Sequence, residues 1–216
     1  MRRGNFQDGT VDYAAVGASQ APDLMGYPPE KSIPAEDAWR LGSGGERFAT
    51  SADALLAWAP LRGAGLTVSD VHPAAGPTYS GVSFDDAGTP LAPSKLETEQ
   101  RFDADGTPYV AAGTSLRVHG RVGGLRADAH LRVISVTEEP RRVGFLLGTI
   151  GESVVSGEES FLLEWYENDE VWFRVRAFDR PTSPLYRMLP VLVKRRRREL
   201  FGGYLRALSP LFATPS

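Results

Sequence analysis

Two adjacent glutamates and two arginines are the side chains of this sequence with types and spacing best suited to joint chemistry. Glu158 and Glu159 begin one predicted strand, and Arg176 and Arg180 end the next. Only a short turn separates these strands, so we expect the acidic and basic groups to meet at one end of a hairpin. A carboxylate there could form a salt bridge that orders the sheet, or transfer protons if burial raises its pKa. We favour the salt bridge.

The two glutamates cannot form a close carboxylate pair. Neighbouring residues of a strand point to opposite faces of the sheet. We therefore predict that one glutamate turns inward and is held by an arginine of the 170–180 strand, with Arg176 as the first candidate. An arginine fork could also anchor a carboxylate or phosphate of a ligand, and Arg180 could instead bond Asp179 or a backbone carbonyl.

The residues that other common kinds of functional site require are missing from this sequence. The absence of cysteine excludes disulfides and thiolate nucleophiles, and His72, His119 and His130 do not have the spacing of metal ligands. No serine lies in a GxSxG motif. The LGSGG stretch at 41–45 lacks the ending of a phosphate-binding loop, and we interpret it as a turn before a strand. We expect no metal and no cofactor.

The carboxyl-terminal half contains the clearest strand patterns. Apolar and polar residues alternate along 160–165 and 171–177, and the polar residues 167–169 are typical of a turn. Aromatic residues on this hairpin are candidates for the wall of a ligand cavity, although some of them must belong to the core. These candidates are Phe161, Trp165, Trp172, Phe173 and Phe178.

Further strands and one helix are predicted before this hairpin. The strands cover 66–71, 114–121, 126–137 and 142–148, and their last connections are too short for crossover helices. The helix begins at Thr50 or Ser51 and ends at Pro60. We interpret residues 72–93 as a long excursion and the Gly/Pro-rich residues 13–45 as an arm laid over the domain. Tyr27, Trp39 and Leu41 would anchor this arm.

A long amphipathic helix is predicted from near Pro190 to 208, because apolar residues recur there every three or four positions. It contains the basic run 194–198. This run could attract nucleic acid or anionic lipid. We favour a solvated face whose arginine stems cover the sheet rim and whose heads pair with the acidic region 85–105. We expect no specific nucleic-acid partner.

These elements predict an α+β fold in which a curved antiparallel sheet packs on the long C-terminal helix. This arrangement resembles the helix-grip fold of START-like and Bet v 1-like lipid-binding proteins. The alternative is a closed β-barrel with helical decorations. The 216 residues, 42% of them hydrophobic, favour one domain over 13–216, with residues 1–12 disordered.

Short motifs in the same region resemble a bacterial and plant family whose domain has no assigned function. The pieces are LGT at 147–149, GEE at 157–159 and AFDRP at 177–181, which are similar to the family pattern YGTLPGHPExGEE followed by AFSRP. The sequence departs from this pattern at Leu147, Ser153, Val155 and Asp179, where the family has Tyr, His, Glu and Ser. The resemblance implies a fold and no reaction.

The resulting hypothesis is a cytoplasmic protein that holds a small, mostly apolar ligand between the sheet and the C-terminal helix. No secretory signal and no run of about 20 apolar residues is present. Two alternatives remain open. One is an enzyme that uses a cavity glutamate with an arginine, and the other is a protein-interaction module that uses the basic helix.

Overall fold

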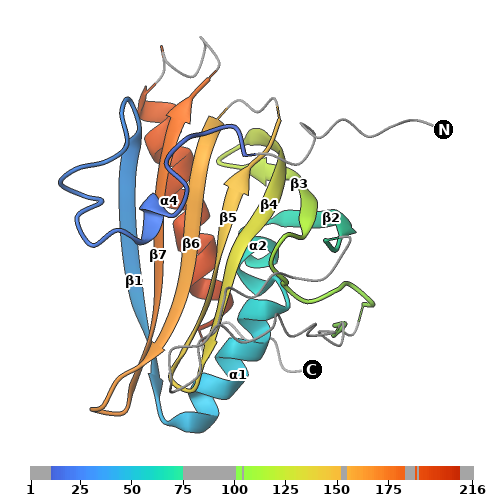
Figure 1. Cartoon of the computed structure of the whole chain (residues 1–216), viewed down its shortest axis with the longest axis vertical. Helices are drawn as coiled ribbons and strands as arrows, with labels where there is room; N and C mark the ends of the chain where they lie inside the picture. The colour runs from blue at the N-terminus through green and yellow to red at the C-terminus, as the bar shows by residue number, and fades with distance from the viewer. Residues whose placement is uncertain are drawn as a thin grey trace, which may run out of the picture.

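A seven-stranded antiparallel sheet forms the body of the protein (Figure 1). The computed structural model describes residues 11–74, 101–103, 105–151, 155–182, 188 and 190–209. The strands are β1 (Ile33–Ser43), β2 (Leu66–His72), β3 (Ser115–Val122), β4 (Leu125–Glu139), β5 (Arg142–Thr149), β6 (Val155–Trp165) and β7 (Glu170–Pro181). Their order across the sheet is β1-β7-β6-β5-β4-β3-β2, so β3 to β7 form the predicted meander.

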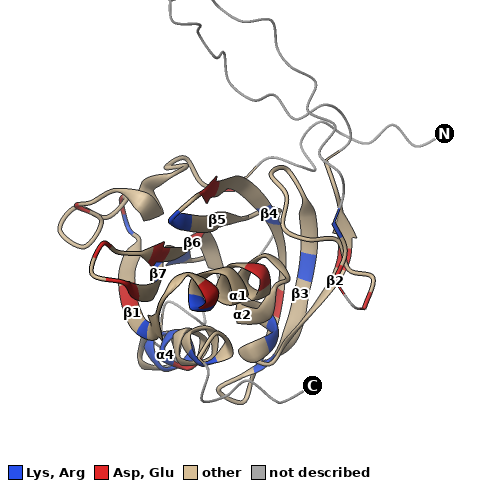
Figure 2. Ribbon diagram, turned by 90° about the horizontal axis from the view of Figure 1, so that it is seen from below, with Lys and Arg blue, Asp and Glu red and all other residues tan. Residues whose placement is uncertain are grey.

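The helices lie inside the curve of this sheet. They are α1 (Gly45–Leu56), α2 (Ala59–Gly63) and α4 (Pro190–Ala207), and a short 3₁₀ turn, η1 (Ala18–Gln20), lies on the outer face. Figure 2 shows the sheet wrapped around α1, α2 and α4. The sheet order begins at β1 and ends at β2, and these two strands do not pair with each other. The prediction of an α+β helix-grip fold is therefore confirmed, and the closed barrel is not formed.

The inner face of the β6–β7 hairpin forms the centre of the core. Phe161, Val171 and Phe173 have no exposed surface. The ring of Phe161 stacks on Phe145 at 4.9 Å and meets the edge of Tyr204 from α4 at 5.1 Å. Aromatic pairs at such distances add to the gain from burying their area, so they fix α4 against the hairpin.

The N-terminal segment is more regular than the predicted arm. Residues 33–43 form β1, which pairs with β7 along nearly its whole length. Leu41 is buried as predicted, whereas Tyr27 is 82% exposed and Trp39 is 48% exposed, so these two residues are not anchors. The edge position explains why the pattern was missed, because an edge strand buries only part of its surface and tolerates Pro34 at its start.

The first helix begins earlier than predicted. α1 starts at Gly45, directly after β1, so the LGSGG stretch ends a strand and begins a helix, and is not a turn before a strand. Gly44, at φ 92°, adopts a conformation that glycine tolerates best, and its carbonyl accepts the amide hydrogen of Phe48. Most of the predicted excursion, residues 75–93, lies outside the described residues, as do residues 1–10 of the segment 1–12 that was predicted to be disordered.

Within the described part of the chain, no helix is long and apolar enough to cross a membrane.

Candidate functional site

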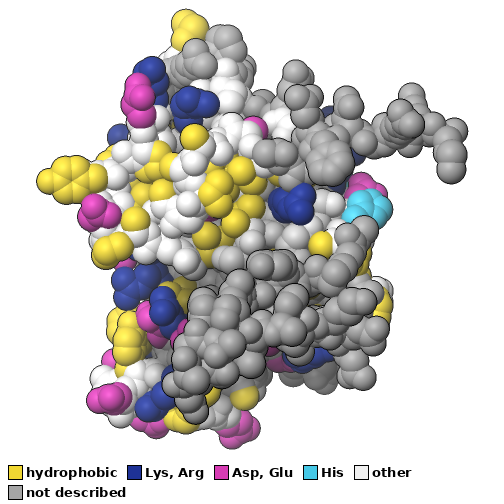
Figure 3. All heavy atoms as spheres, in the orientation of Figure 1, with side chains coloured by type: hydrophobic (Ala, Val, Ile, Leu, Met, Phe, Trp, Pro, Cys, Tyr) yellow, Lys and Arg dark blue, Asp and Glu magenta, His cyan; other side chains and the backbone are white. Residues whose placement is uncertain are grey.

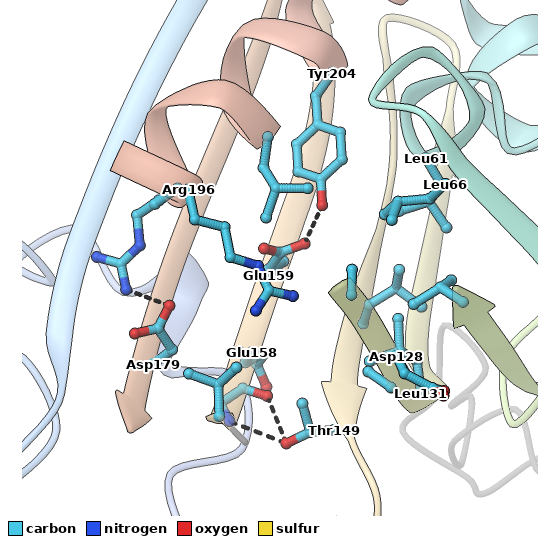
Figure 4. Close-up of a pocket in the computed structure, with 18 of the residues that line it drawn as sticks. Leu61, Leu66, Asp128, Leu131, Thr149, Glu158, Glu159, Asp179, Arg196 and Tyr204 are labelled. Atoms are coloured by element: carbon cyan, nitrogen blue, oxygen red, sulfur yellow. Dashed lines mark hydrogen bonds and ion pairs between the residues drawn. The ribbon is translucent and has the colours of Figure 1, made fainter. Parts of the chain in front are cut away.

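A cavity of about 110 Å³ lies between the inner face of the sheet and α4 (Figure 4). Most of its wall is aliphatic and comes from α2, the strands β2 to β6, and α4. These aliphatic residues are Leu61, Leu66, Val118, Ala127, Ala129, Leu131, Leu147, Val155, Val193 and Leu200. A polar end is formed by Glu159, Asp179, Arg196, Arg197 and Tyr204. Asp128 of β4 and Thr149 of β5 also border it. The cavity therefore has a mostly apolar body, and most of its charged residues lie at one end.

Glu159 is the acidic residue of β6 that faces this cavity. Its neighbours across the sheet are Leu147 on β5 and Ala177 on β7, which offer no polar partner. The hydroxyl of Tyr204 on α4 donates a hydrogen bond of 3.1 Å to its Oε2 atom. Burial penalises the charged form and raises the pKa of the Glu159 carboxyl from 4.5 to about 7, against the opposing hydrogen bond from Tyr204. Glu159 is thus an acid that titrates near neutral pH.

Two arginines of α4 complete the polar end. Arg197 forms an ion pair with Asp179 of β7, and its Nη1 atom also donates to the carbonyl of Ile33 at 3.0 Å. Burial raises the pKa of Asp179, while the charges of Arg197 and Arg196 oppose that rise. Figure 4 shows Arg196 reaching from α4 toward Glu159. The positive charge of Arg196 favours the ionised forms of both carboxyl groups.

The helical repeat explains why these arginines face inward. Val193, Leu200 and Tyr204 share the α4 face toward the sheet, and Arg196 and Arg197 lie three and four residues after Val193 on that face. The sequence predicts one solvated face for the basic run 194–198. It is divided instead. Two arginines enter the cavity wall and the other three basic residues, Lys194, Arg195 and Arg198, are exposed.

Glu158 points to the opposite, outer face and is only 2% exposed. The N-terminal segment covers it there. Its carboxylate accepts hydrogen bonds from the Tyr13 hydroxyl at 2.9 Å, the Gly17 amide at 2.8 Å, and both the amide and the hydroxyl of Ser19. The Tyr13 ring lies over Gly148, where a Cβ atom would stand 2.2 Å from its hydroxyl. This arrangement binds the N-terminal segment to the sheet and holds the Glu158 carboxylate on the outer face, while the residue itself is among those that border the cavity.

The predicted pairing of Arg176 with a β6 glutamate is corrected by the structure. Arg176 lies on the outer face, and its Nε atom donates to Glu36 of β1 at 3.0 Å. Arg180 is exposed on the same face. Both residues have the strand parity of Glu158, but the N-terminal segment occupies that carboxylate. The arginines that approach the inward glutamate come from α4, 37 and 38 residues away in sequence, which no local pattern reveals.

The aromatic candidates are spread over three environments. Phe161 and Phe173 belong to the solid core. Trp165 stacks on Phe48 of α1 at the far end of the hairpin, with ring centroids 5.9 Å apart. Trp172 lies on the outer face and donates to Glu170, and Phe178 meets Tyr13 edge-on at 5.5 Å. Only Phe178 borders the cavity at all, so the wall is aliphatic where aromatic residues were expected.

The described residues hold no group of three His, Asp or Glu side chains that could bind a metal ion. His119 pairs across the sheet with Asp128 and His130 with Arg117, so the two histidines do not oppose each other. Of the four departures from the family pattern, Leu147, Val155 and Asp179 border the cavity, and Ser153 lies outside the described residues.

Comparisons with known proteins agree on family and fold. The model of the Domain of unknown function (DUF1990) matches residues 81–207. A UPF0548 protein of Deinococcus radiodurans is 39% identical over 77 residues, which make up 36% of this chain and 39% of that protein.

Two solved structures resemble the fold. A hypothetical protein of Helicobacter pylori has a TM-score of 0.51 at 10% identity, and the match covers 98% of both chains. The di-domain ARO/CYC BexL of the BE-7585A biosynthetic pathway has a TM-score of 0.50 at 10% identity, over 88% of this chain and 52% of that one. Similarity at this level of identity extends to the fold alone.

Proposed function

We propose that this chain binds a small, mostly apolar molecule in the cavity between the sheet and α4. The chain belongs to the family of the Domain of unknown function DUF1990. The observation that carries this proposal is the combination of an aliphatic wall with one polar end. Binding pockets typically join such a wall to a few polar groups that orient the ligand. A filled core of the same fold would have neither the space nor the buried charges.

The size of the cavity limits the ligand. An aliphatic protein cavity of about 150 Å³ can hold benzene. The present volume of about 110 Å³ suits a molecule, or part of one, with roughly one small ring or a short alkyl chain. The polar end adds a requirement for a hydrogen-bonding group on that molecule, because it brings two carboxyls, a phenol and two guanidinium groups together.

Methyl NMR tests this proposal with benzyl alcohol as the probe. Titration should shift the methyl signals of Leu131, Leu147 and Leu200, which border the cavity, and leave those of Leu163 in the core unchanged. Ala129→Leu should fill the space and abolish these shifts. Ala38→Leu, on the outer face of β1, is the matched control and should retain them. Absence of shifts at millimolar probe, or equal shifts in both variants, would contradict the proposal.

A second candidate function is supported by the titration of Glu159 near neutral pH. General acid–base catalysis works best when the pKa of the group lies close to the working pH. Native mass spectrometry of protein purified from its own host would identify any retained molecule. Incubation of that molecule with fresh protein should then yield a product of altered mass, which Glu159→Gln abolishes and Arg176→Gln, an outer-face variant, retains. Unchanged mass with wild-type protein would exclude catalysis on that molecule.

A further inference from the structure

A second hollow lies on the outer face of the sheet, on the side away from the cavity described above. This outer groove has a volume of about 420 Å³ and is bordered by residues of β1, β5, β6 and β7 and by Gln20 and Pro22 of the N-terminal segment. We propose that it binds an oxyanion, a phosphate or carboxylate group of a small molecule, beside Ser160 and Arg176. The inference goes beyond the proposed function, because it concerns the opposite face of the sheet and requires no ligand in the cavity.

The charged side chains around the outer groove leave one positive charge. Those that border it are Arg142, Arg174, Arg176, Glu36 and Glu164. Nη1 of Arg174 and Nε of Arg176 each donate to Glu36 at 3.0 Å. Glu164 lies 4.0 Å from Nε of Arg174 and 3.9 Å from Nε of Arg142. Two carboxylates thus neutralise two of the three guanidinium groups, and the remaining charge favours an anion.

The outer groove is also richer in hydrogen-bond donors than in acceptors. Both carboxylate oxygens of Glu36 accept from arginines, and Oε2 of Glu164 accepts from the Tyr166 hydroxyl at 3.0 Å. The 3.9 Å between Arg142 and Glu164 exceeds hydrogen-bond range, so that pair is held by charge alone. Arg176 donates to Glu36 through Nε, and its Nη atoms are further donors of a planar fork that fits the oxygens of a carboxylate or phosphate.

Ser160 is a second and independent indication of a ligand. The residue is only 3% exposed, borders the outer groove and lies directly opposite Arg176 in the sheet. Its hydroxyl has no hydrogen bond with any group in the part of the chain that the structure describes. Buried hydroxyls normally have a partner. A hydroxyl beside a guanidinium group can donate to the same oxyanion, and that bond would satisfy it.

The register of the sheet sets the position of the oxyanion in the outer groove. Leu162 follows Ser160 on the same face of β6 and borders the groove, so it offers an apolar surface to the rest of the ligand. Arg142 pairs with Glu164, four residues along β6, which is roughly 13 Å from Ser160 at about 3.3 Å per residue. The oxyanion therefore contacts Ser160 and Arg176, and Arg142 attracts it from a distance.

Amide NMR titration tests the site with inorganic phosphate and acetate as probes, at constant pH and at an ionic strength fixed with sodium chloride. The amide signals of Ser160 and Arg176 should shift and saturate at millimolar probe, and that of Val118 on β3 should stay in place. The anion that saturates at the lower concentration tells whether the group is a phosphate or a carboxylate. Ethylammonium, a matched cation, should cause no saturable shift.

Variants separate a binding site from a network of ion pairs that only stabilises the sheet. Arg176→Gln should weaken the tighter-binding anion at least about tenfold, and Ser160→Ala, which leaves every charge in place, about threefold to tenfold. Glu36→Gln should instead tighten binding about fivefold, because it removes a competing carboxylate. A network with only a structural role would give no such gain. Arg180→Gln, exposed on the same face, is the control and should bind like the parent chain.

Three results would overturn the inference. They are the absence of saturable shifts with both anions, tighter binding of ethylammonium than of either anion, and anion binding that is the same in Ser160→Ala and Glu36→Gln as in the parent chain. Because Ser160→Ala and Glu36→Gln keep Arg176, the test does not depend on the folding of Arg176→Gln.

Discussion

At the scale of single residues, two adjacent glutamates have opposite roles because a strand alternates its side chains. Glu158 accepts four hydrogen bonds under the N-terminal segment, and Glu159 faces the cavity with Tyr204. Neither glutamate needs an arginine of β7. The outer carboxylate of Glu158 accepts four hydrogen bonds, and burial raises the pKa of the inner carboxyl of Glu159.

Glu158→Ala should release the N-terminal segment. The substitution leaves the Tyr13 hydroxyl and the amides of Gly17 and Ser19 without their acceptor, and buried donors that lose a charged partner cost about 1.5–3 kcal/mol each at most. We expect a total loss of about 3 kcal/mol in the free energy of unfolding and faster hydrogen exchange at Gly17 and Ser19. Exchange should remain unchanged in Glu138→Ala, whose side chain is exposed. Slow exchange at both amides of Glu158→Ala would show that other contacts hold the segment.

Glu159 should make the protein less stable at higher pH. Its pKa is about 7 in the folded chain and near 4.5 when unfolded, so between these values the folded chain binds more protons. Stability is then greatest below about pH 4.5 for this group and falls as the pH rises to 7, by about 3 kcal/mol in total. Buried Asp179 acts with the same sign.

Urea unfolding at pH 5 and pH 8 measures this effect. Glu159→Gln should remove most of the difference between the two pH values, and Glu138→Gln, exposed at the end of β4, should preserve it. An equal pH dependence in Glu159→Gln and the parent chain would mean that Glu159 is already ionised at pH 5.

At the scale of elements, the position of α4 decides what the cavity contains. Its N-terminal half carries Arg196 and Arg197 over the ends of β6 and β7, and its C-terminal half packs on α2. The second contact is close because it is made by glycines. A Cβ atom on Gly203 would lie 2.5 Å from the Cα atom of Ala64, and one on Gly63 would lie 2.4 Å from the Cβ atom of Ala207.

Neighbouring glycines of α4 should therefore respond oppositely to alanine. Gly203→Ala meets the backbone of Ala64 and must push α2 and α4 apart, which should cost about 1–3 kcal/mol. Gly202→Ala meets only the flexible end of Arg206 at 3.1 Å, so it should gain up to about 1 kcal/mol from helix propensity. The two variants control for each other in urea unfolding. A stabilised Gly203→Ala variant would mean that the helices have room to separate without loss.

At the scale of the whole molecule, the two faces of the sheet have different partners. The inner face encloses the helices and the cavity. The outer face is covered in part by the N-terminal segment, and Figure 3 shows hydrophobic side chains gathered on this face. In the N-terminal segment, Val16, Met25 and Tyr27 are each more than half exposed. The N-terminal segment thus presents apolar side chains outward while it buries Glu158 beneath.

Nucleic acid should bind the whole protein weakly and without sequence preference. Only Lys194, Arg195 and Arg198 of the basic run are exposed, and Arg195 also forms an ion pair with Glu199. With at most three phosphate contacts, the slope of log K against log salt should be no steeper than about −3. Fluorescence anisotropy with several DNA and RNA sequences measures this slope. Tight, sequence-selective binding at physiological salt would contradict the expectation.

Local periodicity was sufficient for the sequence by itself to determine most elements of the fold. The period-two alternation along β6 and β7, the short connections between β3 and β7, and the recurrence every three or four residues along α4 are properties of residues close in sequence, so the meander and the helix followed from them directly. The strand β1 was not predicted, because apolar and polar residues alternate only weakly along an edge strand. The first turn of α1 was not predicted, because the residues after Gly45 show no apolar pattern.

Tertiary structure alone decided the chemistry of the site. The sequence placed Glu158 and Glu159 on opposite faces of one strand, but which face is the cavity depends on α4 covering one side and residues 11–20 the other. The partner of the inward carboxyl depends likewise on where α4 lies along the sheet, since that brings Arg196 and Tyr204 to Glu159 and leaves Arg176 with Glu36. These pairings join residues far apart in sequence, and their energies exist only when the packed layers bring the side chains together and exclude water.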